Sequence, residues 1–188
     1  SSKDFTKTLN FIKTNKTESH ELLSKYTDAC FLYLRKQVQS GADVIQIFDS
    51  WANLLKKNEL QTFSFDYIAS LINALKIDPV TKNIPVILFA RDPACDSEVL
   101  MGTGADCISL YWSMNNFDMH VSRNKVSLQG NLNPKILLED KETIKRETFK
   151  LLNKYKNYPG YIFNLGHGIT PDIAPDKVKY LTDIVREY

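Results

Sequence analysis

The chain has 188 residues, of which 43% are hydrophobic and 24% are charged, and its formal net charge is +2. This balance is typical of a globular protein with one sizeable core, and we expect a single domain over residues 1–188. The lysines are scattered and form no basic block, so a nucleic-acid partner is not expected. No apolar run approaches the ~18 residues of a membrane span, and the first residues lack the apolar region of a secretory signal. We therefore expect a cytoplasmic protein that does not bind membranes.

Several segments carry the apolar spacing of amphipathic helices, in which apolar residues recur every three or four positions. The four longer ones lie at residues 18–41, 58–76, 144–155 and 178–185. Shorter helices are expected near Thr6 and Ser97. Gly41 follows the first long segment, at the position where a glycine often ends a helix.

Five short apolar runs, rich in β-branched and aromatic residues, lie between these helices and predict strands. They are VIQIF (Val44 to Phe48), PVILFA (Pro85 to Ala90), CISLYW (Cys107 to Trp112), KVSLQ (Lys125 to Gln129) and YIFNL (Tyr161 to Leu165). Nearly continuous apolarity favours parallel strands covered on both faces. The alternation of strands and helices predicts an α/β fold, either an open doubly wound sheet or most of an eight-stranded barrel.

Both architectures gather functional groups where the strands end, and two such ends carry the strongest candidates. His167 lies in NLGHG, and its imidazole either donates to a nearby carbonyl or faces a pocket, where it would bind a carboxylate or relay a proton. Ser50 lies in FDSW and is either a pocket hydroxyl or the N-cap of the following segment. No GxSxG motif surrounds Ser50, so a hydrolase nucleophile is not expected. Asp49 and Asp92 could each be a general base or a residue that caps the following segment, and the sequence does not decide between the two.

No group of histidine, cysteine or carboxylate residues has the spacing of a zinc site, so no metal is expected. His20 and His120 lie in helical segments and are expected on the surface. Three widely spaced cysteines without a CxxC pair favour reduced thiols in a cytosolic compartment.

Five motifs together resemble the uroporphyrinogen decarboxylase family. They are ADVIQIFDSWA, PVILFAR, GAD at Gly104 to Asp106, VSLQGNLNP and FNLGHGITPD, and they occur in that family's order and spacing. The resemblance runs from the SSKDF start to the VREY end. Each motif alone is weak, but the combination of FDSW, QGNL and NLGHG is specific.

The resemblance implies that the chain forms the C-terminal five or so β/α units of a (β/α)8 TIM barrel with parallel strands. It implies decarboxylation of the four acetate side chains of uroporphyrinogen III to give coproporphyrinogen III, in porphyrin and heme biosynthesis, without a cofactor or metal. Ser50 is then expected to hydrogen-bond a substrate carboxylate. His167 is expected to contact the substrate and to act as a catalytic residue that handles a proton or a carboxylate.

The chain also departs from that family. The RQAGRY-type arginines, the aspartate that binds the pyrrole N–H groups and a tyrosine belong to an N-terminal half that this sequence lacks. Tyr111 and Asn133 stand where the family usually has aspartate. We therefore expect the chain to form a homodimer or to pair with the missing N-terminal half. Two alternatives stay open: a non-catalytic half-barrel that binds a porphyrinogen or a partner chain, and a relative of cobalamin-dependent methyltransferases. FARDPAC lacks the histidine of the zinc motif of those methyltransferases.

Overall fold

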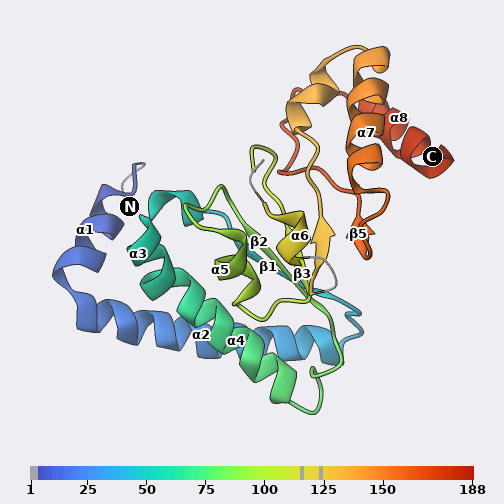
Figure 1. Ribbon diagram of the computed structural model, residues 1–188. Coiled ribbons are helices and arrows are strands. Elements are labelled where there is room, and N and C mark those ends of the chain that lie inside the picture. The colour runs from blue at the N-terminus through green and yellow to red at the C-terminus, as the bar shows by residue number, and fades with distance from the viewer. Residues whose placement is uncertain (1–3, 115–116, 123–124) are drawn as a thin grey trace.

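The computed structural model describes residues 4–114, 117–122 and 125–188 (Figure 1). Its strands form one sheet with the order β1-β2-β3-β4-β5, and every neighbouring pair is parallel. They are β1 (Ile45–Asp49), β2 (Val86–Ala90), β3 (Cys107–Ser109), β4 (Ser127–Gln129) and β5 (Tyr161–Ile162). A doubly wound sheet reverses its strand order at a switch point, whereas a barrel keeps it. The prediction of five β/α units from a TIM barrel is confirmed.

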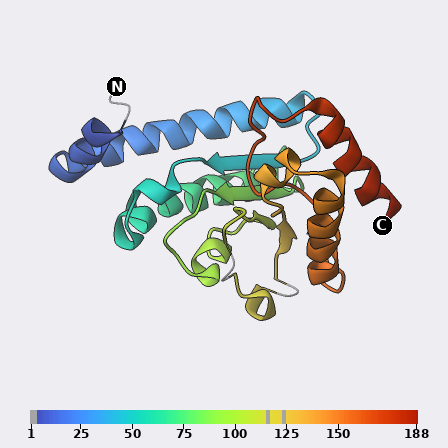
Figure 2. The same ribbon diagram turned by 90° about the horizontal axis from the view of Figure 1, so that it is seen from above.

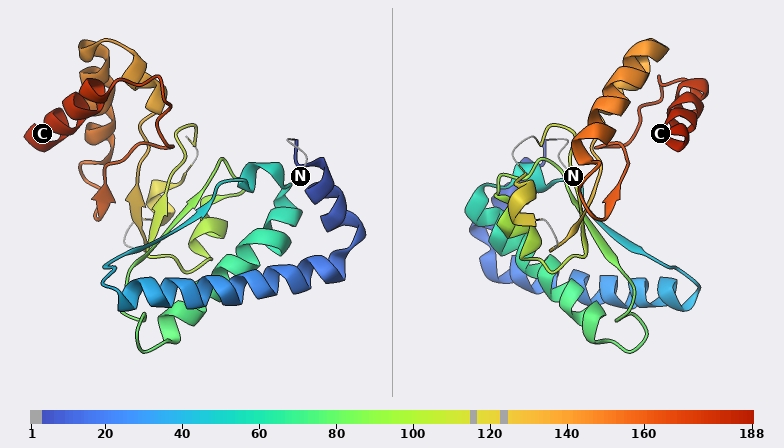
Figure 3. Two further views of the ribbon diagram at one scale, coloured as in Figure 1. Left: turned by 180° about the vertical axis from the view of Figure 1, so that it is seen from behind. Right: turned by 45° about the vertical axis from the view of Figure 1, so that its right-hand side comes forward.

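The helices surround the strands when the molecule is seen from above (Figure 2). They are α1 (Thr6–Thr14), α2 (Lys16–Gln39), α3 (Lys57–Leu60), α4 (Asp66–Ile77), α5 (Ser97–Met101), α6 (Met119–Ser122), α7 (Lys141–Tyr155) and α8 (Pro175–Glu187). Shorter turns are the 3-10 helices η1 (Ala52–Leu54) and η3 (Pro134–Leu138) and the π-helix η2 (Gln61–Phe65). Helices α7 and α8 lie at one end of the molecule and α1 lies at the other (Figure 3).

Local signals explain where two of these helices begin or end. Helix α2 stops at Gln39, and Gly41 follows with φ of 102°, a left-handed conformation that glycine adopts without steric cost. The Asp140 side chain accepts a hydrogen bond from the Thr143 N–H over 2.8 Å and so caps the start of α7.

The register of the strands gives the sheet two chemically different faces, because successive side chains point to opposite sides. One row faces the helices and is apolar: Ile47, Leu88, Ile108, Leu128 and Tyr161. It packs with Leu71, Ile72 and Leu75 of α4 in the main hydrophobic core. The next row points to the opposite face and mixes aromatic, aliphatic and polar side chains: Phe48, Phe89, Ser109, Gln129 and Ile162.

A second hydrophobic cluster joins α7, α8 and η3, and it contains Leu137, Ile144, Leu181 and Ile184. In the described part of the chain, no helix is long and apolar enough to cross a membrane.

Candidate functional site

Ser50 and His167 line one cavity of about 350 Å³ at the carboxyl ends of the strands. The cavity is formed by Gln46, Phe48, Ser50, Phe89, Ser109, Asn164, Leu165, His167 and Gly168. These residues come from β1, β2, β3 and the segment that follows β5. The chain therefore brings together the two side chains that the sequence singled out, although they follow the first and the last strand of the sheet.

The segment after β5 reaches the cavity by crossing back over the ends of β4 and β3. The Gly166 N–H donates to the carbonyl of Leu132 over 2.8 Å, and the Gly166 carbonyl accepts from the Trp112 N–H over 3.2 Å. A Cβ on Gly166 would lie only 2.4 Å from the Trp112 nitrogen. Only glycine allows this close approach of two backbones, and the approach places His167 beside the ends of β2 and β3.

The imidazole of His167 is held by aromatic rings and only weakly by hydrogen bonding. Its centroid lies 5.8 Å from that of Tyr111 and 6.2 Å from that of Phe89, with interplanar angles of 86° and 66°. Its Nδ1 lies 3.4 Å from the carbonyl oxygen of Gly168, which is longer than a normal hydrogen bond. The imidazole is exposed, so its nitrogens are accessible to a ligand in the cavity.

Ser50 does not act as a helix cap. The turn η1 is preceded by Trp51 and has no side-chain cap. The Trp51 N–H instead donates to the carboxylate of Asp49 over 3.3 Å. Among the described residues, none makes a hydrogen bond with the Ser50 hydroxyl, which lies half-buried in the cavity wall. This hydroxyl can therefore donate to a bound group.

Two residues that line the cavity, Gln46 and Ser109, belong to a polar network that also includes Gln129. The side-chain amide of Gln129 donates to the hydroxyl of Ser109 over 3.0 Å and lies 3.5 Å from the amide oxygen of Gln46. Ser109 and Gln129 are 4% and 5% exposed, and such buried polar groups need partners. Strands β1, β3 and β4 thus contribute hydrogen-bonding groups at or next to the cavity that Ser50 and His167 line.

The walls of the cavity are aromatic. Phe48 and Phe89 pack with ring centroids 5.8 Å apart. Phe48 is 63% exposed, although it lies within a strand, so a large apolar surface is open to a ligand. His167 is the one residue with a basic side chain among those that line the cavity in the described part of the chain. The site therefore offers apolar contacts and neutral hydrogen-bonding groups, but few charges.

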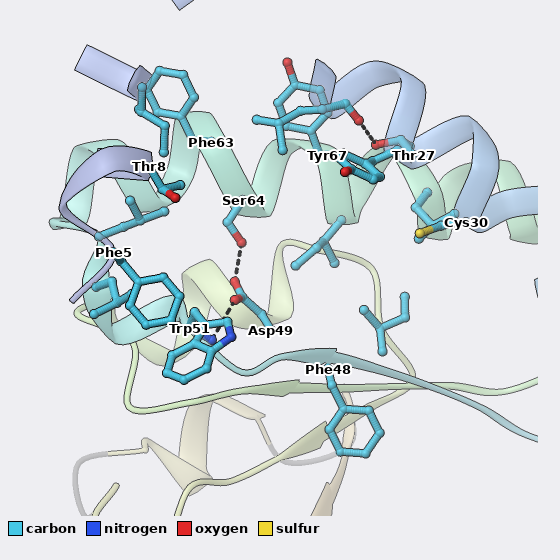
Figure 4. A pocket seen from close by; sticks show the side chains of 18 of the residues that line it. Phe5, Thr8, Thr27, Cys30, Phe48, Asp49, Trp51, Phe63, Ser64 and Tyr67 are labelled. Atoms are coloured by element: carbon cyan, nitrogen blue, oxygen red, sulfur yellow. Dashed lines mark hydrogen bonds between the residues drawn. The ribbon is translucent and has the colours of Figure 1, made fainter. Parts of the chain in front are cut away.

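A larger cavity of about 460 Å³ lies in the helical layer, between α1, α2, α4 and β1 (Figure 4). Its lining is mostly apolar, and Figure 4 shows the Asp49 carboxylate pointing to the Ser64 hydroxyl, which donates to it over 2.5 Å. With Ser64 and Trp51 as donors, Asp49 has a structural role and does not face His167. Asp92, the other aspartate considered as a base, accepts a hydrogen bond from the Ser113 hydroxyl over 3.1 Å.

The remaining candidates carry no chemistry at this site. No group of three histidine, cysteine or carboxylate residues in the described ranges could hold a metal ion. His20, which was expected on the surface, is half-buried: its Nδ1 lies 2.6 Å from the Tyr67 hydroxyl, and its ring stacks on Phe63. The side chain of His120 lies outside the described part. Cys30, Cys95 and Cys107 are free thiols.

Comparisons with known proteins agree with the motifs. The profile of the family described as Uroporphyrinogen decarboxylase (URO-D) matches residues 1–188. A uroporphyrinogen decarboxylase from Ruthia magnifica subsp. Calyptogena magnifica is 37% identical over 190 residues, which cover 100% of this chain and 54% of that protein. The uroporphyrinogen decarboxylase from Hydrogenobaculum sp. (strain Y04AAS1) is 39% identical over 187 residues, which cover 100% of this chain and 53% of that protein. The chain thus spans about half the length of the curated relatives it matches.

A solved structure supports the fold independently. A methyltransferase from Methanosarcina mazei superposes with a TM-score of 0.73 at 20% sequence identity, over 95% of this chain and 52% of that one. This similarity concerns the fold alone. The family profile, the relatives and the motifs around Ser50 and His167 agree, and the chain belongs to the uroporphyrinogen decarboxylase family.

Proposed function

We propose that this chain is the C-terminal half of a uroporphyrinogen decarboxylase and provides half of the wall of its substrate cavity. The proposal rests on one observation: Ser50 and His167 line the same cavity at the carboxyl ends of the strands. The curated relatives that match the chain are named for this activity, which gives the substrate class.

The cavity suits the chemistry of such a substrate. The pyrrole rings would pack on the aromatic walls at Phe48 and Phe89, and carboxylate side chains would accept hydrogen bonds from Ser50 and His167. In the reaction, a pyrrole ring carbon takes up a proton, the bond between the acetate methylene and its carboxylate breaks, and CO2 leaves. The electron pair moves into the ring, the methylene then takes up a proton to become a methyl group, and the ring carbon loses its proton. We propose that His167 handles a proton or a carboxylate in these steps, because its side chain lines the cavity.

The same cavity supports the expectation of a second half. Uroporphyrinogen carries eight carboxylates, and His167 is the one basic residue that lines the cavity in the described ranges. The sheet also ends at β1 and β5 with open edges, which folded proteins usually cover. Apolar side chains of α2 are exposed as well, with Tyr26 at 61%, Leu32 at 62% and Tyr33 at 65%. We propose that an N-terminal half-barrel covers these surfaces and supplies the missing charges; a second copy of this chain is the other arrangement to test.

The alternative is a half-barrel that binds a porphyrinogen without converting it. The absence of a carboxylate from the described cavity lining favours this alternative, because no group there can accept hydrogen bonds from the pyrrole N–H groups as an aspartate would.

Decarboxylation can be assayed with the chain alone, with a separately expressed N-terminal half of a relative, and with both together. Formation of coproporphyrinogen only in the mixture supports the proposal, and light scattering on the same samples distinguishes a mixed complex from a homodimer. Activity of the isolated chain would contradict the need for a second half. Binding of uroporphyrin without turnover in the mixture would instead support the non-catalytic alternative.

A further inference from the structure

The imidazole of His167 forms a triangle of rings with Tyr111 and Phe89. The ring centroids of Tyr111 and Phe89 lie 6.4 Å apart, and each ring contacts the imidazole. Phe89 is only 6% exposed and belongs to the packed sheet, whereas Tyr111 is half-buried. Tyr111 does not line the cavity itself. Any effect of its side chain on a ligand in the cavity must therefore pass through a neighbour.

The backbone of Tyr111 is fixed on both sides of the contact. The side-chain amide of Asn131 donates to the Tyr111 carbonyl over 3.1 Å. The next residue, Trp112, donates its N–H to the carbonyl of Gly166, directly before His167. The Tyr111 ring and the imidazole are thus attached to two segments joined by a backbone hydrogen bond, and the angle of 86° between the rings sets the face that the imidazole presents.

Hydrogen bonds among the described residues do not provide this orientation. The contact between Nδ1 of His167 and the Gly168 carbonyl is long at 3.4 Å. Gly168 is also the next residue in the same loop, so this contact does not tie the imidazole to the rest of the protein. Perpendicular aromatic pairs are favourable and directional, so they can fix a ring that lacks strong hydrogen bonds.

We propose that Tyr111 is a positioning residue for His167: its ring, not its hydroxyl, holds the imidazole with its nitrogens toward the cavity. The hydroxyl of Tyr111 makes no hydrogen bond to another described residue. Replacing Tyr111 by Phe should therefore preserve the orientation of the imidazole, whereas replacing it by an aliphatic residue should not. The consequence for ligand binding rests on the function proposed for His167, but the orientation itself does not.

NMR spectroscopy of the 188-residue chain tests the orientation without any ligand. The chain has three histidines, so the ring signals of His167 are assigned by their loss in His167→Gln. We expect nuclear Overhauser contacts between the rings of Tyr111 and His167. The His167 signals should keep their positions in Tyr111→Phe and move toward unstructured values in Tyr111→Leu. Tyr33→Leu, which changes an exposed tyrosine of α2, is the matched control and should leave them unchanged.

The absence of ring-to-ring contacts in the unmodified chain would overturn the proposal, even if Tyr111→Leu did not fold. Unchanged His167 signals in a folded Tyr111→Leu would overturn it as well, as would equal changes in Tyr111→Phe and Tyr111→Leu.

Binding of uroporphyrin, followed by its fluorescence, then tests the consequence in a double-mutant cycle with His167→Ala. We expect Tyr111→Leu to weaken binding by about threefold to tenfold in the parent chain and to have no further effect once His167 is removed. Additive effects would show that Tyr111 acts independently of His167 and would contradict the positioning role. If the parent chain does not bind uroporphyrin, the proposed function fails for the isolated chain, while the NMR result still decides the orientation.

Discussion

Gly166 lies directly against the backbone of Trp112, and this contact determines where His167 lies. The Trp112 N–H donates to the Gly166 carbonyl over 3.2 Å, and a Cβ on Gly166 would lie 2.4 Å from the same nitrogen. A Cβ on Gly168, on the other side of His167, would meet no atom of another described residue within 4 Å. The two glycines that flank the histidine therefore have different roles.

Gly166→Ala should destabilise the chain, because the added methyl group forces two hydrogen-bonded segments apart. We expect a loss of about 1–3 kcal/mol in the free energy of unfolding, measured by urea denaturation, and a displacement of the His167 ring signals. Gly168→Ala is the matched control, and its effect should be small. Equal stability of Gly166→Ala and the parent chain would show that the close backbone approach is wrong.

The three cysteines should differ in reactivity toward iodoacetamide at pH 8. Cys30 is exposed, whereas Cys107 is buried, and burial raises the pKa of the Cys107 thiol to about 12. A raised pKa leaves little of the reactive thiolate, roughly one molecule in 10⁴ at this pH. Burial likewise raises the pKa of Cys95 to about 11. Peptide mapping by mass spectrometry should find Cys30 labelled first; in guanidinium chloride the three rates should converge. Labelling of Cys107 as fast as Cys30 in the folded chain would contradict its buried position.

Asp140 should make stability depend on pH through the start of α7. The backbone hydrogen bond from Thr143 lowers the pKa of its carboxyl below the usual 3.8. A lowered pKa in the folded state stabilises the chain above pH 3.8, and this stabilisation is lost as the pH falls through the lowered value. Asp140→Ala should therefore be less stable than the parent at pH 7, and the difference in their free energies of unfolding should become smaller below pH 3.8.

Asp140→Asn is the control for this effect, because asparagine caps a helix without a charge. Its free energy of unfolding, measured by urea denaturation, should be close to that of the parent at pH 7. It should not show the loss of stability that Asp140 causes as the pH falls. A gap between Asp140→Ala and the parent that is constant from pH 7 to pH 2 would show that the carboxylate charge contributes nothing.

The apolar runs predicted all five strands, and the first residues of the strands lie within two positions of the predicted ones. Their ends were less predictable. Strand β3 ends at Ser109 within the run CISLYW, and β5 ends at Ile162 within YIFNL. The residues that follow make isolated contacts: Leu165 pairs with Leu132 in a single bridge, and the Trp112 N–H donates to the Gly166 carbonyl. Such contacts join segments that are distant in sequence, so the spacing of apolar residues does not predict them.

Local patterns also failed where tertiary packing decides the environment. The segment 58–76 has a regular helical stripe, yet it contains the π-helix η2, whose Ser64 binds Asp49. The sequence pattern predicts that His20 of α2 is exposed to solvent, but α4 packs against α2 and provides Tyr67 as a partner for the imidazole. The roles expected for Ser50 and His167 rest on the family motifs, whereas the structure alone shows that the two residues share a cavity.

The most direct test of the proposed site is the rate of uroporphyrinogen decarboxylation by this chain combined with an N-terminal half, with and without His167→Ala. His167 lies at a loop and is exposed, so its removal should leave the unfolding midpoint unchanged and lower turnover by about 10² or more. Full turnover by a folded His167→Ala complex would show that the cavity shared by Ser50 and His167 is not where the reaction takes place.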